Sequence, residues 1–180
     1  MANRQALREL QTRLADRLQA ARTNTSQGAS WLAVQVAGHN YLLPLEQAGE
    51  IFSWPSVLRV PYTNTWFWGV ANLRGSLVGV VDLGTYLGHP IERTEQSLQE
   101  VSLLVVNPAL QVNVALVVDR LLGLRGADDF ISTAIEPAQD APQASAGIVA
   151  ASYTDSAGGS WQVLQLHQLV QSPDFLSIRI

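Results

Sequence analysis

The chain has 180 residues, of which 47% are hydrophobic and 14% are charged, and its formal net charge is −4. It is too apolar for a disordered chain and long enough for one buried core or two small, closely joined lobes. The absence of cysteine excludes disulfides and thiolate metal sites, and the absence of lysine excludes a standard P-loop or a Schiff base. The acidic balance argues against nucleic acid as a partner.

The chain begins with a pattern that predicts an amphipathic helix followed by a polar linker, together residues 1–29. Apolar residues recur there at spacings of three or four, at Leu7, Leu10, Leu14, Leu18 and Ala21. This charged start does not resemble a signal peptide, and the longest apolar runs, of about five residues, are too short to span a bilayer. We therefore expect a cytoplasmic protein.

The remainder, residues 30–175, has the pattern of a mainly β domain, because short apolar runs alternate with turn residues. Short helical turns are expected after two of the runs, at Leu83–Leu87 and Leu166–Val170. The predicted strands are Trp31–Val36, Tyr41–Leu45, Ile51–Trp54, Val57–Val60, Gly69–Leu73, Leu77–Val81, Val101–Val106, Val112–Val118, Leu121–Leu124, Ala146–Tyr153 and Trp161–Leu166.

A weak internal repeat indicates two similar β lobes. The run Tyr41–Ile51 has the same order of strand, acidic position, bend and strand as Val114–Leu124. Further along, Val80–Leu83 followed by Leu87 is echoed by Val163–Leu166 followed by Val170. The repeat predicts a first lobe around residues 35–90 and a second around residues 100–165.

No catalytic or metal-binding motif is recognisable in the sequence. The three histidines, His39, His89 and His167, lack the spacing of a helical metal motif and are interpreted as surface or turn residues. The acidic pair Asp128-Asp129 is interpreted as a turn or helix cap. We therefore expect no enzyme activity, no cofactor and no metal site.

The run Trp66-Phe67-Trp68 is unusual, because side chains alternate along a strand and three adjacent aromatic residues cannot all face one core. Either a bend buries them together, or at least one of them lies on the surface. Trp66 and Trp68 are therefore candidates both for core packing and for anchoring a partner.

The segment Asn72-Leu73-Arg74-Gly75 connects two predicted strands, with Gly75 able to take a positive φ. Arg74 is an isolated cation, and its guanidinium suits a carboxylate acceptor. Glu50 also stands among uncharged residues and is a plausible acceptor. Spacing alone favours this pair no more than two unrelated solvated charges.

The sequence resembles the CheW-like chemotaxis adaptor family. The resemblance is carried by Gly69–Gly75, by Val80-Val81-Asp82-Leu83 and by Leu87-Gly88, with further matches at Tyr41–Leu45, Glu50-Ile51 and Val117–Leu124. It extends from about Trp31 to Val170. The long N-terminal helix is similar to that of PilI-type adaptors, which serve the chemosensory systems of type IV pili and twitching motility.

The resemblance implies two five-stranded SH3-like barrels packed together and a non-enzymatic scaffold. The implied partners are a CheA-type histidine kinase and the cytoplasmic tip of a methyl-accepting chemoreceptor, so contact with the inner membrane would be indirect, through receptor arrays. By motif position, the binding surface includes Glu50, Arg74, Ala48, Ile51, Asn72 and Gly75. The alternatives are an adaptor of a flagellar array, a small-ligand-binding β-barrel, and a hydrolase with an unrecognised Ser/His/Asp set.

Overall fold

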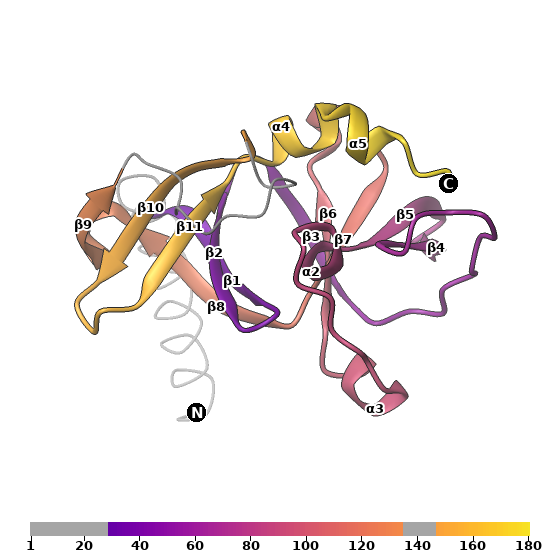
Figure 1. Cartoon of the computed structure of the whole chain (residues 1–180), viewed down its shortest axis with the longest axis horizontal. Helices are drawn as coiled ribbons and strands as arrows, with labels where there is room; N and C mark the ends of the chain where they lie inside the picture. The colour runs from indigo at the N-terminus through magenta and orange to yellow at the C-terminus, as the bar shows by residue number, and fades with distance from the viewer. Residues whose placement is uncertain (1–28, 135–146) are drawn as a thin grey trace, which may run out of the picture.

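The structure, a computed structural model, describes residues 29–134 and 147–180 and places about half of them in the strands of two sheets (Figure 1). The strands are β1 (Ala29–Val36), β2 (His39–Pro44), β3 (Ala48–Ser53), β4 (Phe67–Leu73), β5 (Ser76–Asp82), β6 (Ser102–Val106), β7 (Val114–Val118), β8 (Arg120–Gly126), β9 (Phe130–Ala134), β10 (Val149–Asp155) and β11 (Ser160–Leu164). The helices are short: α2 (Leu83–Tyr86), α3 (Glu95–Leu98), α4 (Leu166–Gln171) and α5 (Pro173–Leu176), with 3₁₀ turns at Pro108–Leu110 and Ala127–Asp129.

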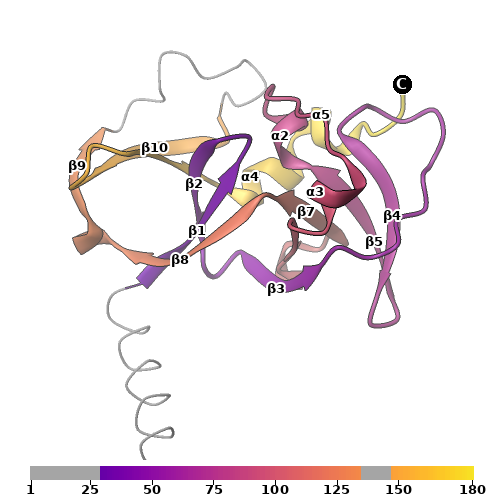
Figure 2. The same ribbon diagram turned by 90° about the horizontal axis from the view of Figure 1, so that it is seen from below.

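The six-stranded sheet, called sheet A here, has the order β8-β1-β2-β11-β10-β9, and the five-stranded sheet B has the order β3-β6-β7-β5-β4. Neighbours are antiparallel except for one parallel pair in each sheet, β2 with β11 and β5 with β7. Figure 2 shows how strongly sheet A curves. The mainly β, two-sheet prediction is confirmed.

The two sheets are built from two sequence repeats that exchange their first hairpins. Strands β1 to β5 form one repeat, and β6, β7, β8, β10 and β11 form the other. In chain order, the counterparts of β1, β2, β3, β4 and β5 are β6, β7, β8, β10 and β11. When each strand of sheet B is replaced by its counterpart, the order becomes β8-β1-β2-β11-β10, which is the order of sheet A without β9. The β1–β2 hairpin therefore completes the sheet of the second repeat, and the β6–β7 hairpin completes the sheet of the first.

This exchange differs from the predicted division into lobes. Contiguous lobes at residues 35–90 and 100–165 would keep β2 with β3 and β7 with β8, whereas the strand pairing separates both couples. Sheet A also has six strands instead of five, because β9 adds an edge that the apolar pattern did not predict. The predicted strand Val57–Val60 is absent, and only Leu58 forms a bridge there, to Val70 of β4.

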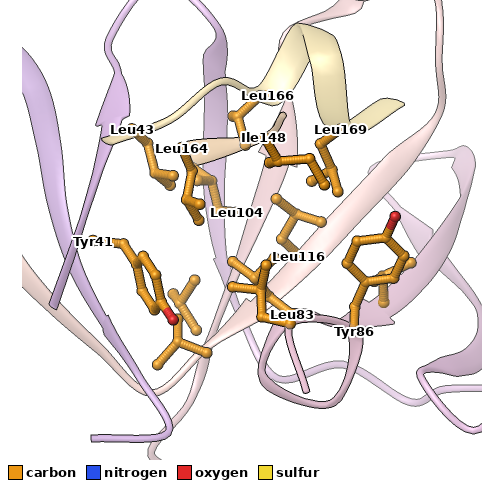
Figure 3. Close-up of a cluster of buried hydrophobic side chains, with 14 of the residues drawn as sticks. Tyr41, Leu43, Leu83, Tyr86, Leu104, Leu116, Ile148, Leu164, Leu166 and Leu169 are labelled. Atoms are coloured by element: carbon orange, nitrogen blue, oxygen red, sulfur yellow. The ribbon is translucent and has the colours of Figure 1, made fainter. Parts of the chain in front are cut away.

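Among the described residues, apolar side chains form three clusters, and the largest lies where the two sheets meet (Figure 3). It takes Leu43 and Leu164 from sheet A, and Leu104 and Leu116 from sheet B. Smaller clusters line one further face of each sheet, around Trp68 in sheet B and around Trp161 in sheet A. Because the main core is shared, neither sheet buries its apolar surface alone.

A buried charged network also joins the sheets. The Arg93 side chain, only 5% exposed, forms ion pairs with Asp82 at the end of β5 and with Asp119 after β7. Asp119 also accepts a 2.6 Å hydrogen bond from the backbone N–H of Ala37, in the β1–β2 turn of sheet A. Asp82 caps α2 by accepting from the Gly84 N–H and from the Thr85 hydroxyl.

The N-terminal helix is predicted within residues 1–29, and residues 1–28 lie outside the described residues. Ala29 is the first residue of β1. Within residues 29–134 and 147–180, the helices are all too short to cross a lipid bilayer.

Candidate functional site

Glu50 and Arg74, the candidate partners from the sequence, form a solvent-exposed ion pair between β3 and the β4–β5 turn. The Arg74 Nη1 donates to Glu50 Oε2 over 2.9 Å, and the two side chains are 75% and 61% exposed. A pair so exposed contributes only about 0–1 kcal/mol to stability. The pair is therefore better suited to presenting a fixed charge pattern to a partner than to holding the fold together.

Arg74 owes its position to the tight turn between β4 and β5. Leu73 pairs with Ser76, so the loop consists of Arg74 and Gly75 alone, and both have positive φ, 49° and 88°. A two-residue loop of this kind fits the natural twist of a hairpin and favours glycine. The Asn72 side-chain oxygen accepts a 2.8 Å hydrogen bond from the Gly75 N–H and so stabilises the loop.

Glu50 lies in an irregular part of edge strand β3, where the pairing with β6 shifts between Ala48 and Ile51. The intervening Gly49 permits a close backbone approach, because a Cβ there would lie 2.7 Å from the Val105 carbonyl oxygen. Such bulges bend a strand and can redirect a side chain. The local sequence thus explains why Glu50 faces the neighbouring hairpin turn.

An apolar depression lies beside the pair. The Arg74 guanidinium is 5.2 Å from the centre of the Phe52 ring, which packs against the interior cluster of sheet B. The depression is lined by Glu50, Phe52, Leu73, Arg74, Ser76, Val78, Val105 and Pro108. It combines one cation, one carboxylate and an apolar floor, which suits a protein side-chain partner better than a catalytic reaction.

The other predicted residues of this surface lie on two elements, the β4–β5 hairpin and strand β3. Gly75 belongs to the turn, Asn72 lies near the end of β4 and is hydrogen-bonded to Gly75, and Ile51, 44% exposed, lies next to Glu50 on β3. Ala48 is partly buried against the core between the sheets. Sequence reasoning missed Phe52, although its spacing of two from Glu50 places both side chains on one face of a strand.

The aromatic run on β4 is mainly a packing feature. Phe67 packs in the shared core and Trp68 in the interior cluster of sheet B, as alternation along a strand requires. Trp68 meets Trp54 edge-on at 5.5 Å, and Trp66 stacks on Phe175 of α5 with ring centres 5.7 Å apart. Trp68 is therefore buried, and the half-buried Trp66 is covered on one side by α5.

The internal repeat shows that the charged pair has no counterpart in sheet A. The repeat aligns Tyr41–Ile51 with Val114–Leu124, so Leu124 is the counterpart of Ile51. The strand pairing is consistent with this, because Ile51 of β3 pairs with Leu104 of β6 and Leu124 of β8 pairs with Leu32 of β1. The position before it, which corresponds to Glu50, is Gly123. Sheet A therefore presents a different edge, with Leu121 and Leu124 exposed.

Other candidate groups make contacts away from the Glu50–Arg74 pair. Asp129 accepts a hydrogen bond from the Gly126 N–H, as expected for a turn or cap. The rings of His39 and His89 stack on each other with centres 4.1 Å apart. In residues 29–134 and 147–180, groups of three or more metal-ligating side chains do not occur.

Comparison with known proteins places this fold in a family. The family model described as the CheW-like domain matches residues 30–174. Protein PilI of Pseudomonas aeruginosa is 29% identical over 162 residues, which are 89% of this chain and 85% of PilI. The crystal structure of the scaffolding protein TtCheW from Thermoanaerobacter tengcongensis is similar in fold, with a TM-score of 0.64, 18% identity, and coverage of 82% of this chain and 95% of that one. With most of its length matched by the family model and by a CheW-type fold, the chain belongs to the CheW-like family.

Proposed function

We propose that this protein is a non-enzymatic adaptor that couples a methyl-accepting chemoreceptor to a CheA-type histidine kinase. Its place would be the receptor arrays at the cytoplasmic side of the inner membrane, reached through the receptor and not through lipid. Membership of the CheW-like family supports a scaffolding role, and the relative TtCheW is described as a scaffolding protein. The likeness to PilI favours the chemosensory system of type IV pili and twitching motility over a flagellar array.

The observation that carries the proposal is the exposed Glu50–Arg74 pair beside its apolar depression. The two charges are held at 2.9 Å by a bulge and a two-residue turn, yet both remain mostly exposed to solvent. Protein interfaces combine a desolvated apolar centre with polar groups at the rim, and arginine is enriched in them. Ile51, Phe52 and the turn residues would form the rest of this contact.

The test is a pull-down of the kinase and of a receptor cytoplasmic fragment by the wild-type chain and by two variants, Glu50→Ala and Arg74→Ala. Both variants should fold, because an exposed pair contributes only about 0–1 kcal/mol. We expect each to weaken the three-component assembly by about tenfold, which corresponds to roughly 1.4 kcal/mol of binding free energy.

The matched control is Arg120→Ala, which removes an exposed arginine from β8 on the other sheet. It should leave assembly unchanged. Full assembly by both Glu50→Ala and Arg74→Ala would exclude the proposed surface. Failure of the wild-type chain to capture any CheA-type kinase would exclude the function.

A further inference from the structure

Two histidines meet where the two sheets touch. His39 begins β2, beside the turn of the hairpin that the first repeat contributes to sheet A, whereas His89 follows α2 at the end of sheet B. Their rings are 4.1 Å apart at the centres and inclined by 21°, so the two imidazoles are stacked. The contact thus joins elements from different sheets.

The backbone around the stack is tightly packed. A Cβ on Gly84 of α2 would lie 3.4 Å from the Ala37 Cβ and 3.1 Å from the His89 carbonyl oxygen. The His89 N–H donates to the Gly84 carbonyl over 2.8 Å, and His39 Nδ1 lies 3.0 Å from the Ala37 carbonyl oxygen, which it can bind as a donor. These contacts hold the backbone of the hairpin turn close to the turn after α2, and they place the exposed His39 ring against the half-buried His89 ring.

The electrostatic surroundings of His89 favour its neutral ring. Burial lowers the pKa of His89, and the neighbouring His39 lowers it further. Tyr41, also near His39, carries no charge at neutral pH, and burial raises its pKa further, to about 12. The nearby Asp119 and Asp82 could favour a proton, but Arg93 pairs with both of them.

We propose that the stacked His39 and His89 form an acid-sensitive contact between the sheets, which is stable while the His89 imidazole is neutral and weakens when it is protonated. This inference goes beyond the adaptor function and does not depend on it. The sign follows from proton binding: the unfolded chain, with an ordinary histidine pKa of about 6.5, binds a proton more readily than His89 does in the fold. The contribution to stability is therefore complete above that pH and is lost as the pH falls through the lower pKa of the folded state.

The test combines an NMR titration of the imidazole carbons with hydrogen exchange of the β1–β2 hairpin amides in the full chain. In the wild type, His89 should titrate below the ordinary range, and hairpin protection, corrected for the intrinsic exchange rate, should fall between pH 7.5 and 5. The expected fall is up to about tenfold for each unit by which the pKa of His89 lies below its unfolded value.

Two variants and a control decide the outcome. In His39→Gln, the titration of His89 should move back toward the ordinary range, and in both His39→Gln and His89→Gln the acid-dependent loss of protection should shrink. The control His167→Gln, on α4, should behave as the wild type. The proposal is overturned if His89 titrates unchanged in His39→Gln, or if both variants lose hairpin protection in acid as the wild type does.

Discussion

Replacing Arg93 by alanine is expected to destabilise the fold by about 3–5 kcal/mol, since removing one partner of a buried ion pair leaves an uncompensated charge. The Asp82 side chain is only 1% exposed, so its carboxylate would lose its cation without gaining water. Asp119 would lose the same partner while still holding the N–H of Ala37. The loss would therefore weaken the junction between the sheets.

Chemical denaturation would measure this effect as a shift in the free energy of unfolding. Arg120→Ala, at an exposed position on β8, is the matched control and should change stability by no more than about 0.5 kcal/mol. The double variant Arg93→Ala with Asp82→Asn should lose less than the sum of the two single variants, because it also removes the orphaned charge. Equal costs for Arg93→Ala and Arg120→Ala would contradict the role assigned to the network.

Separating the chain into residues 1–99 and 100–180 should abolish folding of both halves. Gln99 and Glu100 are exposed, so the cut itself disturbs no core residue. The first half would retain the β1–β2 hairpin without its neighbours β8 and β11, and the second would retain β6–β7 without β3 and β5. Each half would also expose its share of the core between the sheets, and isolated hairpins are marginal in water.

Mixing the halves should restore one folded complex, because every missing neighbour is present on the other fragment. Size-exclusion chromatography and thermal unfolding would follow this recovery, with the intact chain cleaved between residues 99 and 100 as the control. A cooperative unfolding transition in either isolated half would show that the lobes fold as contiguous units and that the exchanged hairpins are not needed.

The sequence was sufficient to predict the two-lobed β architecture but not the hairpin exchange. Tyr41–Ile51 and Val114–Leu124 repeat the same pattern, so their similarity reveals two units. It does not reveal which unit a strand pairs with, because β2 and β7 each carry an apolar run that either sheet could bury. Pairing is decided by tertiary contacts between distant residues.

The same limit applies to the proposed binding surface and the buried network. Glu50 and Arg74 stood out because each is an isolated charge, but spacing left open whether they pair, and the structure brings them within 2.9 Å of each other. Arg93 lies in the polar stretch between the repeats, where an arginine normally remains solvated. Only the fold shows that Asp82 and Asp119 converge on it.

The adaptor function is tested most directly by kinase autophosphorylation in membranes that carry the receptor, measured with and without the full chain. Receptor and kinase alone should give an activity that does not respond to the receptor's stimulus. Adding the wild-type chain should make the activity respond, and Arg74→Ala should respond less at the same concentration. A response that is equally strong when the chain is omitted, or that is still absent when it is added, would contradict the proposal that this protein couples receptor to kinase.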